Sequence, residues 1–391
     1  MDWQPSSLDR GYGSGERLLS GGKLWTTHAG HDGLGTPHRG PSKSGRVART
    51  SGMVNLDGSK GEGGGQILRT ALTLSLITGR PFQIRQIRAN RDKPGLRPQH
   101  LAAVRAAAKL GNAEVSGAAV GSRSLTFRPG TVDARDMTID IGTAGSTALV
   151  LQTLYLPLAM KAQSGVRLVL EGGTFNVAAP SFPFMATTWT AHLRRLGLTV
   201  GLAMPSAGFY PSGGGRLDAW IEPGTPKAMV LDSRGPLVAI RGEAGVCRLD
   251  RSIAERMIAR VEDRLQARGI IPEIRLVEWP GTSPGTAISL TADHGSSLAT
   301  FVGLGERGKP AELVADEAAD ELFAYLDVPQ AAIDPHSADQ LLLPLALAEG
   351  RSVFTVSEVT EHLRTNAETI AAFLDRPIAI DEGNPSRIVI G

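Results

Sequence analysis

Apolar and polar positions follow a regular order along most of the chain after residue 52, switching between the two-residue period of strands and the 3.6-residue period of helices. In the first block, a strand-like run leads into three consecutive glycines, and a helical pattern begins directly after them. The block predicts strands over 54–57, 82–89, 113–118 and 124–128 and helices over 66–78 and 98–110. Its order is therefore β-α-β-α-β-β.

The same order of elements recurs twice. The second block predicts strands over 137–141, 166–171, 198–203 and 216–222 and helices over 146–161 and 184–196. The third predicts strands over 229–232, 352–356, 377–381 and 387–390 and helices over 338–348 and 364–374. Such internal repetition predicts one structural unit used three times. Two helices on one face of each four-stranded sheet can be buried against those of the other units, which predicts an α/β (α+β) fold.

The third block is interrupted over residues 233–331. This segment predicts helices over 251–267 and 311–326 and strands over 237–243, 273–278, 287–292 and 299–304. An insertion into an exposed loop is tolerated because its two ends return close together. We therefore expect a small α/β domain at 233–331 and a large domain of three repeats at 53–232 and 332–391. Residues 1–52, rich in Gly, Ser, Arg and His and without a period, predict a disordered extension.

Composition excludes several classes of protein without naming a function. The chain has 391 residues, of which 41% are apolar, enough for a substantial core. Its net charge of +2 does not indicate any particular class of binding partner. The single cysteine, Cys247, excludes an internal disulfide and fits a reducing compartment. No apolar run has membrane-spanning length and no signal-peptide core precedes the first block, so we expect a cytoplasmic protein that does not bind membranes.

The glycine-rich stretch 61–70 is the first candidate site. Glycines let the backbone approach a ligand, and the free amides of the following helix attract anions. The stretch is neither a Walker-type phosphate loop nor GxGxxG. Glu62 offers a carboxylate to a hard cation and Arg69 a guanidinium to a phosphate. A tight turn with an ordinary surface ion pair is the alternative interpretation.

A second glycine-rich turn, 142–147, holds the same place in the second block. Two equivalent helix N-termini are natural partners for one polyanion. Ser146 and Thr147 could instead serve only as helix caps.

The loop 90–100 gathers cations and hydrogen-bonding side chains and is stiffened by two prolines, Pro94 and Pro98. Arg91, Lys93, Gln99 and His100 are candidates for phosphate contacts, which supply much of the affinity for nucleic acids. A solvated basic loop is the alternative.

His362 lies just before the last predicted helix, between Glu361 and Arg364. A neutral imidazole can attack a phosphorus atom when another group fixes its tautomer. Residues of this kind at a helix start are more often caps or core residues, so this alternative stays open.

Six strings in order carry a family resemblance over residues 53–391. They are GEGGGQILRTALTLSLITG, NRDKPGLRPQHLAAV, GTAGSTALVLQTLYLP, GFYPSGGG, SADQLLLPLALA and EHLRTN. Together they resemble the RNA 3′-terminal phosphate cyclases. The resemblance implies three β-α-β-α-β-β repeats with a small inserted domain.

The resemblance also implies a reaction in three steps. A histidine similar in position to His362 takes AMP from ATP, passes it to an RNA 3′-phosphate, and the ribose 2′-OH then closes a 2′,3′-cyclic phosphate. For this reaction Glu62 is the candidate ligand of a divalent cation, Mg²⁺ or Mn²⁺, and the candidates for the RNA phosphate are Arg69, Arg91, Lys93, Gln99 and His100. The residues implied for the nucleotide are Gln152, Pro180, His336, Ser337, Ala338, Asp339 and Gln340. His336 departs from the family's usual aromatic, and 182–184 lacks the family's acidic residue.

Two other functions fit parts of the pattern. One is a non-catalytic relative that binds ribosomal RNA during processing, a class that lacks the histidine found here at position 362. The other is an enzyme with a similar repeated fold that acts on small phosphorylated metabolites and needs no basic loop like 90–100.

Overall fold

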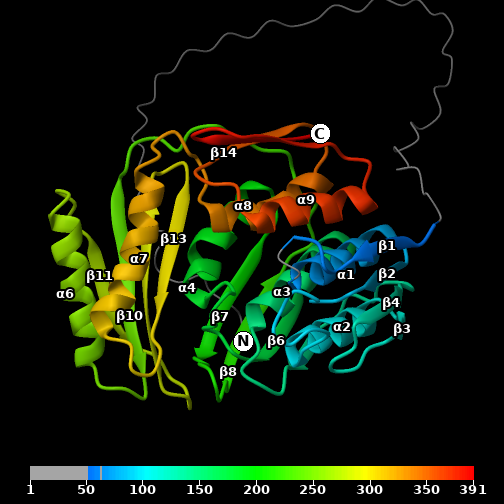
Figure 1. Ribbon diagram of the computed structural model, residues 1–391, viewed down its shortest axis with the longest axis horizontal. Coiled ribbons are helices and arrows are strands. Elements are labelled where there is room, and N and C mark those ends of the chain that lie inside the picture. The colour runs from blue at the N-terminus through cyan, green and yellow to red at the C-terminus, as the bar shows by residue number, and fades with distance from the viewer. Residues whose placement is uncertain (1–51, 62–63) are drawn as a thin grey trace, which may run out of the picture. The chain divides into compact units, whose positions relative to one another are not determined.

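The computed structural model describes residues 52–61 and 64–391 (Figure 1). Glu62, the predicted cation ligand, and the extension predicted for residues 1–52, except its last residue, lie outside these ranges. Within them, no helix has the length and apolar character needed to cross a membrane.

The first sheet contains four strands in the order β1-β2-β4-β3. β1 pairs parallel with β2, whereas β4 runs antiparallel to both of its neighbours. Helices α1 and α2 follow β1 and β2. The elements are β1 (Val54–Asp57), α1 (Gln66–Thr78), β2 (Phe82–Arg85), α2 (Pro98–Leu110), β3 (Glu114–Ser116) and β4 (Ser124–Arg128).

The second sheet has the same pattern, with the order β5-β6-β8-β7 and one parallel pair. Its helical segment after β6 is divided by a π-helix, η1. The elements are β5 (Met137–Asp140), α3 (Thr147–Lys161), β6 (Val166–Gly172), α4 (Phe182–Phe184), η1 (Met185–Trp189), α5 (Thr190–Arg195), β7 (Val200–Ser206) and β8 (Gly215–Ile221).

The third sheet is formed by segments that lie far apart in the sequence. β9 (Val230–Leu231) pairs parallel with β14 (Ser352–Val356), and the order is β9-β14-β16-β15. Strand order and direction are thus alike in the three sheets, and the predicted α+β class is confirmed. The remaining elements are α8 (Pro335–Leu347), α9 (Glu361–Phe373), β15 (Ile378–Asp381) and β16 (Ser386–Ile390).

Between β9 and α8 the chain forms a fourth sheet, in the order β11-β10-β12-β13, covered by two helices. The helices and this sheet share a hydrophobic core that is separate from the main one. The limits 233 and 331 for an independent domain stay a prediction. The elements are β10 (Ala239–Cys247), α6 (Ser252–Gln266), β11 (Glu273–Glu278), β12 (Gly285–Asp293), β13 (Leu298–Leu304) and α7 (Ala311–Leu326).

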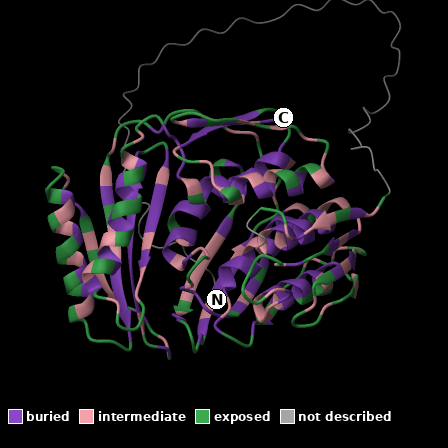
Figure 2. Cartoon of the chain, viewed as in Figure 1, coloured by how far each residue is buried: buried purple, intermediate pink, exposed green. Residues whose placement is uncertain are grey.

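The main core lies where helices of the three repeated units pack together. α1 packs against α2, α3 and α9, and α8 packs against α9. α3 is buried around almost its whole circumference, as Figure 2 shows by its purple ribbon. A helix that is apolar all round is stable only inside a core. Residues of α1, α8 and α9 thereby come together beside Gln152 and Tyr155 of α3.

Some element boundaries differ from those that the sequence predicts. β2 ends at Arg85 because Gln86 and Arg88 adopt positive φ angles of 55° and 53°, which a strand does not accommodate. α9 begins at Glu361 because Thr360 caps it, accepting a hydrogen bond from the amide of Leu363. The expectation that His362 precedes the helix is therefore wrong. His362 lies within the first turn of α9.

Candidate active site

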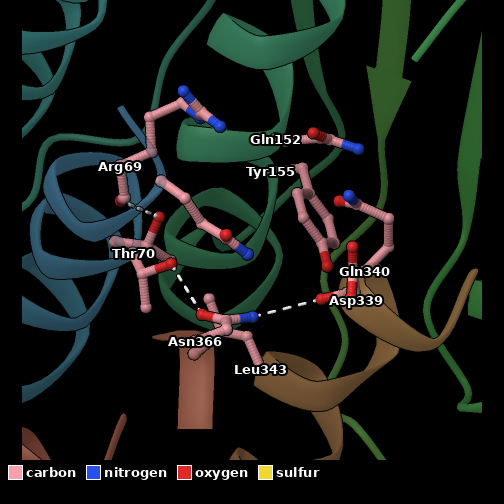
Figure 3. Close-up of a pocket in the computed structure, with 10 residues that line it drawn as sticks. Arg69, Thr70, Gln152, Tyr155, Asp339, Gln340, Leu343 and Asn366 are labelled. Atoms are coloured by element: carbon pink, nitrogen blue, oxygen red, sulfur yellow. Dashed lines mark hydrogen bonds between the residues drawn. The ribbon is translucent and has the colours of Figure 1, made fainter. Parts of the chain in front are cut away.

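A small cavity lies where α1, α3, α8 and α9 meet (Figure 3). Its volume of about 50 Å³ is well below that of a typical small-molecule site, so it can enclose only part of a ligand. The lining residues are Gln66, Arg69, Thr70 and Thr73 of α1, Gln152 and Tyr155 of α3, Asp339, Gln340 and Leu343 of α8, and Asn366 of α9.

A chain of buried hydrogen bonds crosses the floor of this cavity. The hydroxyl of Thr70 donates to Oδ1 of Asn366 over 2.8 Å, and Nδ2 of Asn366 donates to the backbone carbonyl of Asp339 over 3.1 Å (Figure 3). All three residues are buried. Because buried polar groups are costly unless satisfied, these bonds fix α1, α8 and α9 in one arrangement.

Two contacts orient His362. The Thr360 hydroxyl that caps α9 also donates to the Asp339 carboxylate over 2.6 Å, which fixes the start of the helix against α8. The imidazole Nδ1 of His362 lies 2.7 Å from Oε1 of Gln66 on α1. Because an amide oxygen only accepts, Nδ1 carries the proton, and the lone pair is on Nε2. This is the tautomer that a nucleophilic imidazole needs.

Arg69 supplies a positive charge that has no counter-charge among residues 52–61 and 64–391. Its partly buried guanidinium has no hydrogen bond or ion pair within the described residues. Loss of water around it lowers its pKa to about 10, so it stays charged at neutral pH. An arginine held in this way has strong affinity for an anion, because a bound phosphate would supply the missing partner.

His100 lies against Arg69 and the glycine-rich turn. A Cβ at Gly65 would clash with the His100 imidazole and come within 2.8 Å of Nη1 of Arg69. The amide of Arg97 donates to Nδ1 of His100 over 3.2 Å, which leaves the proton on Nε2. Burial, together with Arg69, Arg88 and Arg97, lowers the pKa of His100 to about 3. The imidazole is therefore a neutral donor in a positive field.

The loop before α2 is fixed by its own backbone. Arg88 donates to the carbonyls of Lys93 and Gly95 over 2.7 and 3.2 Å. Gly95 has φ 83° and lies so close to the Gly121 carbonyl that no side chain fits there. Arg91 lies beside the glycine-rich turn, since a Cβ at Gly64 would be 3.4 Å from its Nη2. Lys93 is exposed on the same loop.

Gln99 connects the two glycine-rich turns that the sequence singles out. Its Oε1 accepts a hydrogen bond from the amide of Ser146 over 3.2 Å, at the start of α3. His100, the next residue, contacts Gly65 at the start of α1. The two helix N-termini are thus close to the same cluster of polar side chains.

Only some of the residues that the family resemblance implies for the nucleotide line the cavity. Gln152, Asp339 and Gln340 line the cavity. Ser337 and Ala338 are buried in the first turn of α8. Pro180, in the loop before α4, is not among the lining residues. The exposed His336 is paired with Glu321 over 3.2 Å, and this hydrogen bond raises its pKa to about 9.

The sequence predicts a metal ligand at Glu62. Over residues 52–61 and 64–391 there is no group of three or more His, Cys, Asp or Glu that could hold a metal ion. Glu62 lies outside those ranges.

Several residues of the site are not candidates in the sequence analysis. They include Gln66, Thr70, Tyr155, Thr360 and Asn366. All of these except Thr360 do stand in the strings that carry the resemblance. The family resemblance therefore pointed to the stretches that contain these residues. No sequence pattern, however, shows that Gln66 shares a hydrogen bond with His362, which lies 296 positions away.

The depressed pKa of His100 predicts a pH dependence of stability. The unfolded imidazole titrates near pH 6.5 and the folded one near 3, so the contribution of His100 is complete above pH 6.5 and is lost as the pH falls toward 3. His100→Asn, which keeps an acceptor for the Arg97 amide, should flatten the fall of the unfolding free energy between pH 7 and 5 by at most about 1.4 kcal/mol per pH unit. Urea titrations at both pH values measure this.

His336 provides the control because its pKa shift has the opposite sign. Its raised pKa gives a contribution that is complete below pH 6.5 and is lost as the pH rises through about 9. His336→Asn should therefore change the pH profile only above pH 6.5. The same flattening below pH 6.5 in both variants would contradict the assignment to His100.

Comparison with known proteins agrees with the geometry. Residues 60–380 match the family model described as RNA 3′-terminal phosphate cyclase. A protein of that name from Caldivirga maquilingensis is 45% identical over 335 residues, which covers 83% of this chain and 94% of the relative. Another from Ralstonia nicotianae is 43% identical over 338 residues, with 86% and 96% covered. The enolpyruvyl transferase NikO of Streptomyces tendae is 10% identical with a TM-score of 0.25, covering 87% of this chain and 65% of that one, too low to support an argument.

The fold and the site define an α+β protein with a tautomer-fixed histidine and a group of cations where its repeated units meet. With these matches, the chain belongs to the RNA 3′-terminal phosphate cyclase family.

Proposed function

We propose that the protein is an ATP-dependent enzyme that converts an RNA 3′-terminal phosphate to a 2′,3′-cyclic phosphate through histidine–AMP and RNA–adenylate intermediates. The observation that carries this proposal is the hydrogen bond between His362 Nδ1 and Gln66 Oε1. It fixes the tautomer in which Nε2 of His362 carries the lone pair that such an attack needs, and the cavity next to Gln66 is lined by residues implied for the nucleotide.

In the first step, Nε2 of His362 attacks the α-phosphorus of ATP. A P–N bond forms, the bond from the α-phosphorus to the bridging oxygen breaks, and pyrophosphate leaves. Nδ1 keeps its proton and its bond to Gln66, so the positive charge that develops on the imidazole ring is stabilised by the amide oxygen. Gln152, Asp339 and Gln340 would position the nucleotide.

In the second and third steps the RNA phosphate takes AMP and then cyclises. A phosphate monoester resists attack by its neighbouring 2′-hydroxyl because an oxide is a poor leaving group. In the transfer, an oxygen of the RNA phosphate attacks the AMP phosphorus, the P–N bond to His362 breaks and an anhydride forms. The 2′-hydroxyl then attacks the RNA phosphorus and loses its proton to solvent, and the anhydride bond breaks to release AMP. Arg69, the neutral donor His100 and the loop residue Arg91 surround the glycine-rich turn, where they would hold the anionic phosphate.

A divalent cation, Mg²⁺ or Mn²⁺, would neutralise phosphate charge during these steps. Glu62 remains its proposed ligand. The non-catalytic binding of ribosomal RNA gains no support from the described residues, because the histidine that this class lacks is present here as His362 and is hydrogen-bonded to Gln66.

The direct test is incubation with α-labelled ATP, without RNA, followed by denaturing electrophoresis. A covalent label that survives denaturation and is released by acid supports a histidine–AMP linkage. A protein that takes no label but binds 3′-phosphorylated RNA would contradict the proposed reaction.

Substitution of two cations in the loop 90–100 should distinguish the formation of histidine–AMP from the cyclisation of the RNA. Arg91→Ala and Lys93→Ala should retain much of the histidine–AMP yield but slow the cyclisation of a 3′-phosphorylated RNA about tenfold or more, because a phosphate contact made by a cation is lost. Each variant should also flatten the salt dependence of RNA binding by about one unit of slope or slightly less. Enzyme–AMP yield and cyclisation rate are measured on the same preparations.

Arg128→Ala, an exposed arginine at the end of β4, is the matched control for loss of a positive charge. It should leave both steps unchanged. Equal losses of both steps in Arg91→Ala would mean that the loop binds the triphosphate of ATP.

A further inference from the structure

A second, larger hollow lies at the glycine-rich end of the second sheet. Its volume is about 410 Å³, within the range of sites for small molecules. The turn before α3, the ends of β6 and β7 and the connection from β7 to β8 form its walls. The lining residues are Asp140, Gly142, Thr143, Glu171, Gly172, Ser206, Ser212, Gly214, Gly215 and Arg216.

This hollow begins next to the cluster around Arg69. A Cβ placed on Gly145 would lie 3.3 Å from the Thr143 hydroxyl on one side and 2.9 Å from Cβ of Gln99 on the other. Thr143 lines the hollow, and Gln99 precedes His100 of the cluster. A strand whose terminal phosphate binds near Arg69 can therefore continue past Gln99 into the hollow.

The lining suits a sugar and a base better than a phosphate. Asp140 and Glu171 present carboxylates, and Thr143 and Ser212 present hydroxyls, all on exposed residues. Arg216, the cation among the lining residues, is bound to Asp218 through two hydrogen bonds of 2.6 and 3.0 Å. Carboxylates repel phosphate but accept hydrogen bonds from ribose hydroxyls and base amino groups.

An exposed aromatic stands two residues from Ser212. Tyr210 is 82% exposed, although its neighbour Phe209 is buried and stacks on Phe175 at 4.7 Å with an interplanar angle of 1°. Ser283 fixes the same loop, since its hydroxyl accepts from the Phe209 amide over 2.8 Å and donates to the Gly213 carbonyl over 2.9 Å. An aromatic ring on a rigid loop can stack on a base with little loss of entropy.

We propose that this hollow binds the sugar and base of a nucleotide that precedes the 3′ end of the RNA, with Tyr210 stacking on a base. The inference rests on the proposed function and deepens it: the enzyme would prefer an RNA chain to a free mononucleotide. Binding of the upstream nucleotide would also hold the terminal phosphate near Arg69.

The test compares Tyr210→Ala with the conservative Tyr210→Phe, using a 3′-phosphorylated ten-nucleotide RNA and a nucleoside 3′-monophosphate. Tyr210→Ala should raise KM for the ten-nucleotide RNA at least about fivefold, the low end of what one lost stack costs, and Tyr210→Phe should restore it. KM for the mononucleotide and the enzyme–AMP yield should not change. Ser212→Leu, which narrows the hollow, should have the same selective effect.

The proposal is overturned if Tyr210→Ala leaves KM for the RNA within twofold of the original, or raises KM equally for both substrates. Fluorescence anisotropy with a 3′-hydroxyl RNA, which cannot react, separates this inference from the proposed function. If the original protein forms no enzyme–AMP, the proposed reaction is wrong. Weaker RNA binding by Tyr210→Ala that Tyr210→Phe restores would still support the proposed subsite. Unchanged binding rejects it.

Discussion

Replacing His362 by alanine should abolish covalent AMP labelling and reduce cyclisation by at least about 1,000-fold, because loss of a nucleophile removes the whole covalent route. The bond from Nδ1 to Gln66 fixes the imidazole in the tautomer whose lone pair is on Nε2. Gln66→Ala should lose less, because the nucleophile remains but its tautomer is no longer fixed. Labelling by α-labelled ATP and the cyclisation rate are the two measurements.

His336→Ala is the matched control for the loss of an imidazole. Its side chain is exposed and paired with Glu321, so the variant should fold and should keep a measurable part of the labelling. Full labelling of His362→Ala, together with no labelling of His336→Ala or His100→Ala, would show that His362 is not the nucleophile.

Replacing Arg69 by methionine should slow cyclisation at least about 100-fold and, at the same time, raise the melting temperature by about 2–4 °C. Both effects have one cause. The guanidinium is partly buried without a counter-charge in the described residues, which costs stability in the free protein but increases the affinity for an anion. Scanning calorimetry and cyclisation assays on one preparation measure the pair of effects.

Arg69→Lys is the control, because it keeps the charge but not the planar fork that binds two phosphate oxygens. It should lose part of the activity and gain no stability. A methionine variant that is less stable than the original protein would show that Arg69 serves packing, and its assignment to phosphate would fail. Phosphate or ATP should raise the melting temperature of the original protein more than that of Arg69→Met.

Most of the fold could be predicted from the sequence because each element follows local rules. The bounds of α1 and α2 agree with the predicted 66–78 and 98–110, since glycines or a proline mark their starts and apolar periodicity marks their length. The misplaced starts of α8 and α9 have a local cause as well. Asp334 and Thr360 are ordinary cap residues, and each lies four residues ahead of the predicted first residue.

The site itself could be predicted only in part. Charged residues near glycine-rich turns, such as Arg69 and Arg91, stand out because their chemistry is visible in one short stretch. Thr70, Tyr155 and Asn366 do not, because each looks like an ordinary helix residue until packing places it beside a partner from another repeat. The charge state of His100 is a second example, since three arginines and burial together decide it.

The bond between Gln66 and His362 joins residues separated by 296 positions, and this spacing affects how the protein is made. At ribosomal speeds, α1 emerges roughly 15 to 60 seconds before α9 has been synthesised. During that time the apolar side chains by which α1 packs on α9, within a core that includes Leu68 and Leu72, have no final partner. The nascent chain should therefore be inactive and prone to aggregation until its last helix emerges, and chaperones should raise the yield of folded enzyme more than they raise its activity per molecule.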